Sequence, residues 1–224
     1  MKNELKGVLF DMDGTVLDSE GLFDNAQLAL LKEYNIKSST KELSDFKGMS
    51  YKDFYPQFMK KFNLVDDIEV IRSKLRTYLH DIMEKNLNFI DGFKDFYNSS
   101  IKNKNLKIGL VTNTTRLTFK KIQTFINIDD YFSYVLTSTE AKEPKPSPMP
   151  YLQAMEFLSL NPNQTLIIED SKTGLLSGIK SNAIVFGLTT SLTEDQIKKI
   201  SNNIRIANSY TDIEIFLKNY NGQK

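Results

Sequence analysis

Acidic and hydroxyl side chains recur at one kind of place along the chain, directly after short apolar runs. The first such run ends at Phe10 and is followed by Asp11-Met12-Asp13-Gly14-Thr15. Two later runs are followed by Thr112-Asn113 and by Glu169-Asp170, and Lys145 lies among prolines just before a predicted helix. If the runs are parallel strands, their carboxyl ends meet at one edge of a sheet, and these side chains converge on a single crevice.

This set of side chains suits a phosphate monoester bound through Mg²⁺. Magnesium takes oxygen ligands, usually one or two carboxylates completed by waters and phosphate oxygens, and Asp11 and Asp170 can supply the carboxylates. Thr112 and Lys145 can hold phosphoryl oxygens and neutralise the charge that develops on them. A carboxylate is an accepted nucleophile for phosphoryl transfer, and a second acid two residues away, Asp13, can protonate the leaving oxygen and later activate water. The motifs therefore predict a phosphoryl-transfer enzyme whose nucleophile is Asp11.

The elements that must position these residues fall into two classes. Residues 19–87 have helical spacing only, as the four-residue recurrence of Phe54, Phe58 and Phe62 indicates. From residue 88 onward, apolar runs alternate with amphipathic helical stretches, which predicts a parallel sheet covered by helices on both faces; the runs are 106–111, 134–136, 165–168 and 183–186. We therefore predict an α/β fold: a doubly wound, Rossmann-like parallel sheet built from residues 1–18 and 88–224, with an all-α domain inserted at residues 19–87.

Composition narrows the chemistry further. The chain of 224 residues has 29 basic and 28 acidic residues, a formal net charge of +1, so charge gives no reason to expect a nucleic acid or an anionic membrane as partner. Cysteine is absent, which removes thiolate nucleophiles and thiolate metal sites, and a single histidine, His80, removes chemistry that needs paired imidazoles. No apolar stretch approaches the ~20 residues of a membrane span, and no signal peptide is evident. We therefore expect a protein of the cytoplasm, with a monomer as the default.

The motifs together resemble a known family. Asp-x-Asp-Gly-Thr, Thr-Asn, Lys-Pro-x-Pro and Glu-Asp-Ser-x-x-Gly, in this order, are similar to the four signatures of the haloacid-dehalogenase-like (HAD) hydrolase superfamily. The helical insertion after Asp18-Ser19-Glu20 resembles the cap domain of the β-phosphoglucomutase-like branch. The resemblance implies Asp11 as nucleophile and Asp13 as general acid and base. It further implies a metal site, in which Mg²⁺ is held by Asp11, the Asp13 backbone carbonyl and Asp170, with Glu169 beside them. It also implies a phosphate site formed by Thr112, Asn113 and the catalytic Lys145.

Two enzymatic functions fit the resemblance. The first is a Mg²⁺-dependent phosphatase that hydrolyses a small phosphorylated metabolite, such as a sugar phosphate, through an aspartyl-phosphate intermediate. The alternative is a sugar-phosphate mutase of the β-phosphoglucomutase kind, whose Leu-Lys-Gly-x-Ser-Arg cap segment is matched here at Lys47, Gly48 and Ser50, the predicted substrate-binding residues of the cap. Tyr51 stands where the family's arginine is expected, and Phe23 stands at about the place of a cap histidine. Because a mutase must grip a second phosphate, the loss of the arginine favours hydrolysis.

A third interpretation is a catalytically silent phosphate-binding module on an enzyme fold, because a fold alone does not determine function. The intact Asp11, Asp13, Lys145 and Asp170 argue against this interpretation, since a protein that only binds phosphate has no need of a nucleophile. In each case the expected partner is a small-molecule phosphate ester.

Overall fold

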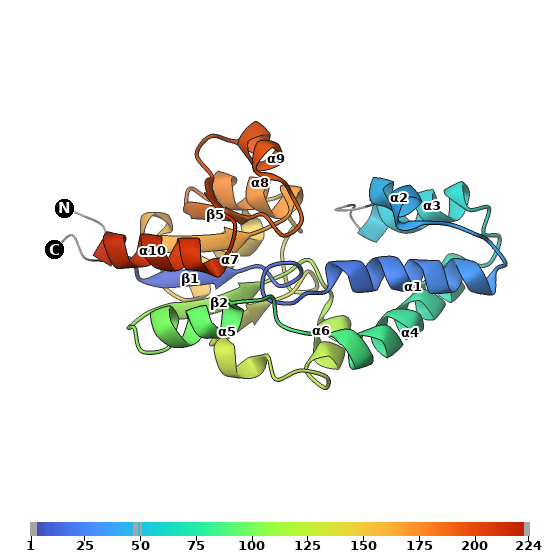
Figure 1. Ribbon diagram of the computed structural model, residues 1–224, viewed down its shortest axis with the longest axis horizontal. Coiled ribbons are helices and arrows are strands. Elements are labelled where there is room, and N and C mark those ends of the chain that lie inside the picture. The colour runs from blue at the N-terminus through green and yellow to red at the C-terminus, as the bar shows by residue number, and fades with distance from the viewer. Residues whose placement is uncertain (1–3, 47–48, 50, 222–224) are drawn as a thin grey trace. The chain divides into compact units, whose positions relative to one another are not determined.

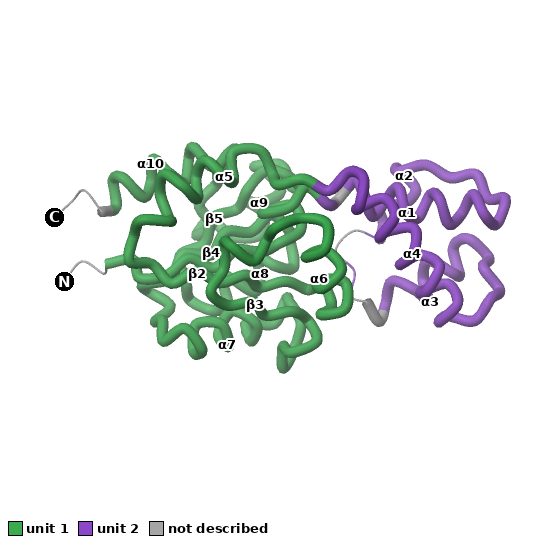
Figure 2. The backbone as a smooth tube through the Cα atoms, turned by 90° about the horizontal axis from the view of Figure 1, so that it is seen from below, with its two compact units in different colours: residues 1–18, 88–224 green, residues 19–87 purple. Residues whose placement is uncertain are grey.

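The structure is a computed structural model, and it describes residues 4–46, 49 and 51–221 of the chain (Figure 1). The chain divides into two compact units (Figure 2). One, here called the α/β unit, comprises Met1–Asp18 and Asn88–Lys224, and the other, here called the helical unit, comprises Ser19–Leu87. Each unit has a hydrophobic core of its own.

A six-stranded parallel sheet forms the centre of the α/β unit, with the strand order β3-β2-β1-β4-β5-β6. The strands are β1 (Gly7–Phe10), β2 (Lys107–Val111), β3 (Tyr134–Leu136), β4 (Thr165–Glu169), β5 (Ile184–Leu188) and β6 (Arg205–Ala207). The chain builds outward from β1 to β3 and then from β4 to β6 on the other side, so the direction of winding reverses between β1 and β4. Open sheets of this kind bind ligands outside the carboxyl ends of their strands at such a reversal. The predicted α/β class with a doubly wound parallel sheet is confirmed.

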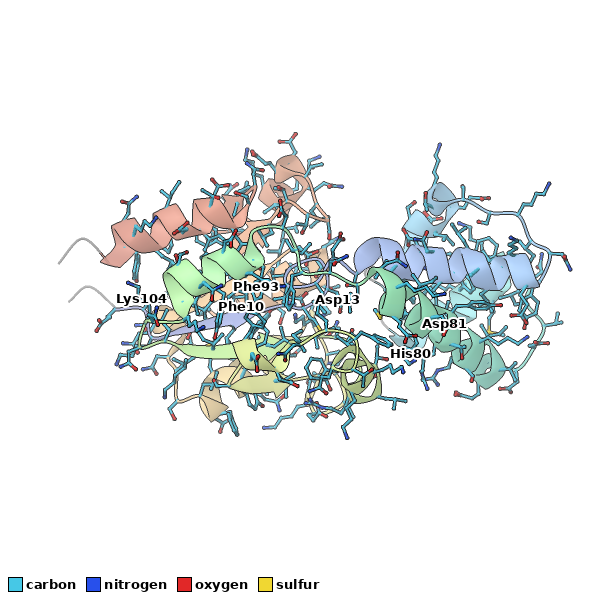
Figure 3. The ribbon with its side chains drawn as sticks, turned by 60° about the horizontal axis from the view of Figure 1, so that its bottom comes forward. Phe10, Asp13, His80, Asp81, Phe93 and Lys104 are labelled. Carbon is cyan, nitrogen blue, oxygen red and sulfur yellow. The ribbon has the colours of Figure 1, made fainter. Side chains whose placement is uncertain are left out.

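Helices cover the two faces of this sheet, whose central strands β1 and β4 are buried over their whole length. Successive residues of a strand point to opposite faces. Leu9 accordingly lies in the core cluster that α7 (Met149–Phe157), α8 (Lys172–Lys180) and α9 (Glu194–Ile200) complete on one face. Phe10 packs edge-on against Phe93 on the other face, with 5.8 Å between the ring centroids (Figure 3). The principal helices of the unit are α5 (Phe93–Phe96), α6 (Arg116–Ile122), α7 (Met149–Phe157), α8 (Lys172–Lys180), α9 (Glu194–Ile200) and α10 (Tyr210–Asn221).

The chain leaves and re-enters the α/β unit through a paired neck, residues 16–18 and 88–90. Leu17 and Phe89 form an antiparallel β-bridge. Backbone hydrogen bonds of 2.9 Å run from Asp18 N to Asn88 O and from Ile90 N to the Val16 carbonyl. The two segments of the neck therefore lie side by side, and backbone hydrogen bonds hold them together.

The helical unit contains α1 (Glu20–Glu33), α2 (Thr40–Leu43), α3 (Tyr51–Lys61) and α4 (Ile68–Asn86). Phe54 and Phe58 of α3 and Phe62 directly after it face the core of the helical unit. All three are buried and form a chain of ring contacts that Phe46 completes. This cluster supplies much of the apolar surface that holds the short helices together. Within the described part of the chain, no helix has the length and apolar character needed to cross a membrane.

An ion pair in the α/β unit joins the start of α6, which follows the loop after β2, to the loop after β3. Arg116, the first residue of α6, donates from Nε to Glu140 Oε1 at 2.9 Å and from Nη2 to Glu140 Oε2 at 3.0 Å. Its Nη2 also donates to the Val135 carbonyl at 3.0 Å, and Glu140 accepts from the backbone N–H of Thr137 at 3.0 Å. Partial burial raises the pKa of Glu140, but the bonds to Arg116 and Thr137 outweigh it and lower the pKa to about 2. The pair thus braces the loop that carries Thr112.

We predict that Phe58→Ala lowers the free energy of unfolding by about 3–5 kcal/mol. The Phe58 side chain is 0% exposed, and its ring centroid lies 5.5, 5.2 and 5.1 Å from those of Phe46, Phe54 and Phe62. Its removal leaves a cavity lined by rings, and the structure around such a cavity relaxes into it only partially. Urea unfolding followed by circular dichroism measures the loss. Val65→Ala, at a residue 93% exposed, is the control, and an equal loss in both variants would contradict the packing argument.

Glu140→Gln should remove a pH-dependent part of the stability. Because the folded pKa of Glu140 lies at about 2, below its ordinary value of 4.5, the carboxylate stabilises the fold above pH 4.5 and loses this effect as the pH falls through about 2. The side chain is 38% exposed, so solvent screening limits the expected difference from wild type at pH 7 to about 1 kcal/mol. Urea unfolding between pH 7 and pH 2 measures the difference, with the exposed Glu156→Gln as control. A gap between wild type and variant that stays constant over this range would refute the prediction.

Candidate active site

Asp11 and Asp13 follow the last residue of β1 and so lie at the carboxyl edge of the sheet. Asp13 is at the opposite end of the sheet from Lys104 (Figure 3). The backbone N–H of Asp11 donates to a β4 carbonyl at 2.9 Å, so the two strands stay paired up to this residue. Gly14 then turns the chain with φ at +77°. A Cβ at Gly14 would lie 2.0 Å from Asp170 Oδ2, so the turn and the Asp170 carboxylate fit together only with glycine at this position.

Three carboxylates form a compact group at this edge, those of Asp11, Glu169 and Asp170. One oxygen of each lies within 4.8 Å of the others, and the residues are 7%, 0% and 0% exposed in that order. Thr15 Oγ1 donates to Asp170 Oδ1 at 3.0 Å, and Ser191 Oγ donates to Oδ2, so both oxygens of Asp170 are oriented. Clustered carboxylate oxygens are the ligands that a hard divalent cation such as Mg²⁺ prefers, and the group fits such an ion.

A buried lysine holds the acidic group together. Lys145 donates from Nζ to Asp11 Oδ1 at 2.5 Å, to Glu169 Oε1 at 2.6 Å and to the Val111 carbonyl at 2.7 Å. Burial lowers the pKa of Lys145, but Asp11 and Glu169 raise it above its ordinary value, so the ammonium form persists. Burial and the charge of Glu169 raise the pKa of Asp11 well above its ordinary value, against the opposing effect of Lys145. One ammonium among three carboxylates leaves negative charge that a bound cation would offset.

The Asp13 side chain faces the loop after β2. Thr114 Oγ1 donates to Asp13 Oδ2 at 2.8 Å, and Thr112 Oγ1 donates to the same oxygen at 3.4 Å. The Thr112 hydroxyl also accepts from the backbone N–H of Thr114 at 2.9 Å. A carboxyl group that is held by hydroxyls two residues from Asp11 has the position that a proton donor and acceptor needs.

Asn113 is tied to the lysine loop. Its Oδ1 accepts from the backbone N–H of Lys145 at 3.1 Å, and its Nδ2 donates to the Lys145 carbonyl at 3.3 Å. The amide therefore clamps the Lys145 backbone beside the loop after β2. The structure brings seven predicted residues to one edge of the sheet: Asp11, Asp13, Thr112, Asn113, Lys145, Glu169 and Asp170.

The predicted cap residues Lys47, Gly48 and Ser50 lie outside the described residues, and their roles stay predictions. Phe23, at about the place of the expected cap histidine, packs against Phe54 with 5.4 Å between ring centroids. It is a partly buried member of the core of the helical unit, which explains an aromatic residue at this position.

Thr15, Thr114, Tyr151 and Ser191 contact the acidic side chains but are not in the predicted set. Tyr151 Oη donates to Glu169 Oε1 at 2.8 Å. Thr15 and Thr114 stand within two residues of predicted ones, and Ser191 follows β5 as the other site residues follow their strands. The rule used for the other strand ends could have found these three. Tyr151 lies in an apolar stretch of α7 and carries no such signal.

Two similar proteins are phosphatases by name. The chain is 28% identical to a pyrophosphatase PpaX from Oceanobacillus iheyensis over 197 residues, which cover 87% of the chain and 88% of the relative. It is 25% identical to a phosphorylated carbohydrates phosphatase from Thermotoga maritima over 193 residues, which cover 85% and 88%. A solved structure of an Entamoeba histolytica HAD hydrolase of family IA, variant 3, has the same fold, with a TM-score of 0.84 at 16% identity and coverage of 96% of this chain and 99% of that one.

A family model supplies the wider classification. The model described as haloacid dehalogenase-like hydrolase matches residues 8–188. This range includes the four motifs and runs from β1 to the end of β5. Since the match covers most of the chain, the protein belongs to the haloacid dehalogenase-like hydrolases, as the resemblance of its motifs predicted.

Proposed function

We propose that the protein is a Mg²⁺-dependent phosphatase that hydrolyses a small phosphorylated metabolite through an aspartyl-phosphate on Asp11. The observation that carries the proposal is the buried Asp11 carboxylate, paired with Lys145 at 2.5 Å and grouped with Asp170 where the sheet reverses its winding. The relatives named pyrophosphatase and phosphorylated carbohydrates phosphatase support the transfer of a phosphoryl group from a small substrate to water.

Asp11, Asp170 and the backbone carbonyl of Asp13 would hold the metal ion, which when bound supplies positive charge beside the phosphoryl oxygens. Thr15 and Ser191 each donate to one oxygen of the Asp170 carboxylate and so would fix its orientation for this role. The other predicted ligand, Glu169, belongs to the same group, although its oxygens already accept several protein hydrogen bonds.

The proposed reaction has two steps, each with its own proton transfer. In the first, an Asp11 oxygen attacks phosphorus and the bond to the leaving oxygen breaks, while the Asp13 carboxyl gives that oxygen a proton. In the second, the Asp13 carboxylate takes a proton from water, which attacks the phosphorus and releases phosphate and the Asp11 carboxylate. The hydroxyls of Thr112 and Thr114 keep Asp13 in place for both transfers. Lys145, which donates to Asp11 Oδ1 at 2.5 Å, would stabilise the negative charge on the phosphoryl oxygens beside Asp11.

The helical unit, Ser19–Leu87, is proposed to act as the cap that excludes water during the first step and selects the substrate. Its segment Lys47 to Tyr51 keeps three residues of the mutase cap motif and lacks the arginine. Because that half-match leaves a sugar-phosphate mutase as the second candidate, the assay must separate hydrolysis from isomerisation.

Wild-type protein should release phosphate from members of a panel of sugar phosphates, nucleotides, inorganic pyrophosphate and p-nitrophenyl phosphate. Release should require Mg²⁺ and stop with a chelator, because the clustered carboxylates would otherwise repel the substrate phosphate. The ranking of substrates would show what the cap selects. No release from any member by folded protein would contradict the phosphatase, and the mutase would then be tested by conversion of β-glucose 1-phosphate.

Asp11→Asn should lower kcat by a factor of at least about a thousand while leaving the fold intact, since the nucleophile is lost. Phosphate release on the best substrate measures activity, and circular dichroism checks the fold. Asp95→Asn, at an exposed residue of α5, makes the same chemical change away from the site and should have wild-type activity. Retained turnover in Asp11→Asn would refute the assignment of the nucleophile.

A further inference from the structure

The ammonium of Lys145 has a complete set of acceptors in the structure. An ammonium has three N–H donors, and those of Lys145 point to Asp11, Glu169 and the Val111 carbonyl at 2.5, 2.6 and 2.7 Å. Contact with a substrate phosphate must therefore replace or share one of these bonds. The position of Nζ relative to Asp11 depends on how firmly the other two acceptors are held.

Glu169 accepts hydrogen bonds from five donors. Its Oε1 accepts from Lys145 Nζ at 2.6 Å and from Tyr151 Oη at 2.8 Å. Its Oε2 accepts from the backbone N–H of Asp170 at 3.2 Å, and from the backbone N–H and Oγ of Ser171 at 3.3 and 3.1 Å. A carboxylate offers about four lone-pair sites, so these five donors already occupy its capacity.

Glycine at position 174 allows this arrangement. A Cβ there would lie 1.8 Å from Glu169 Oε1 and 2.0 Å from Oε2. The carboxylate is therefore seated directly against the first turn of α8, where the backbone dipole of the helix also favours negative charge. The Glu169 carboxylate is thus fixed in position, and its Oε1 accepts hydrogen bonds from both Lys145 and Tyr151.

Tyr151 touches both members of the pair. It is 0% exposed, its hydroxyl bonds to Glu169, and its ring centroid lies 4.8 Å from Lys145 Nζ. A cation over an aromatic face is attracted to it. The tyrosine therefore restrains the carboxylate through a hydrogen bond and the ammonium through its ring, and both restraints come from α7.

We propose that Tyr151 is a positioning residue, which acts through Glu169 to hold Lys145 against Asp11, and that Glu169 serves the lysine rather than binding the metal directly. The inference rests on the proposed function, in which Lys145 stabilises the phosphoryl group. Two side chains, Lys145 and Tyr151, donate to Glu169 Oε1. If the Tyr151 hydroxyl is removed, Lys145 is the side chain that still donates to this oxygen. The ammonium would then be drawn toward Glu169 and away from Asp11 and the phosphate.

Tyr151→Phe tests this by removing one oxygen and keeping the ring. In the full-length chain, kcat/KM on the best substrate should fall about tenfold to a hundredfold. By calorimetry, inorganic phosphate binding at saturating Mg²⁺ should weaken about tenfold, while Mg²⁺ binding itself is unchanged. Tyr97→Phe, which removes a hydroxyl whose acceptor is the Asp130 carbonyl at 3.5 Å, is the matched control and should behave as wild type.

A double-mutant cycle separates positioning from a general effect on the fold. If Tyr151 acts through Glu169, Tyr151→Phe should cause no further loss in a Glu169→Gln background. Full additivity of the two losses, or wild-type phosphate affinity in Tyr151→Phe, would overturn the proposal. A weakened Mg²⁺ affinity in Tyr151→Phe, as expected for Asp170→Asn, would instead make Glu169 a metal ligand. Phosphate and Mg²⁺ binding need no turnover, so these outcomes can be distinguished from failure of the wild-type enzyme to hydrolyse any substrate.

Discussion

The ammonium of Lys145, buried between two carboxylates, is the interaction on which the candidate site depends. A buried ion costs several kcal/mol unless it is paired and hydrogen-bonded. Here the acceptors are Asp11 after β1, the Val111 carbonyl at the end of β2 and Glu169 at the end of β4. One charged atom thus joins the ends of three adjacent strands. The loss of either carboxylate would leave charge uncompensated, and the loss of the carbonyl would leave a buried donor without an acceptor. The strand register, the acidic group and the lysine loop therefore stabilise one another.

The topology of the sheet explains why this pairing occurs where it does. Winding reverses between β1 and β4, so the loops after these two strands diverge to opposite sides and leave room between them. Carboxylates fill this space, and two glycines leave enough volume for them. A side chain at Gly14 would collide with Asp170, and one at Gly174 would collide with Glu169. Polar groups placed there are removed from water by the surrounding strands, which strengthens every charge interaction among them.

The positions of the strand-end residues could be predicted because a buried parallel strand leaves an apolar run, and the polar residue that ends the run stands out. Asp11, Thr112 and Asp170 lie at the carboxyl edge for this reason, and the fold class is confirmed. Tyr151 could not be found in this way, because an aromatic residue on an apolar helix resembles core, and it is core. Whether its hydroxyl meets a carboxylate depends on how α7 packs. The amide of Asn113 likewise turns to the Lys145 backbone for reasons of loop geometry rather than residue type.

The paired neck has a consequence for how such proteins change over evolutionary time. Residues 16–18 and 88–90 are hydrogen-bonded to each other, so the chain departs from and returns to almost the same point. For the α/β unit, the insertion is therefore equivalent to a surface loop with closely spaced ends. The entropic cost of closing such a loop rises only slowly with its length. Helices between these two points can be lengthened, trimmed or exchanged while the pairing of β1 with β2 and β4 is preserved. With the proposed role of the helical unit in selecting the substrate, a change confined to this one segment would alter specificity and leave the residues of the candidate active site in place.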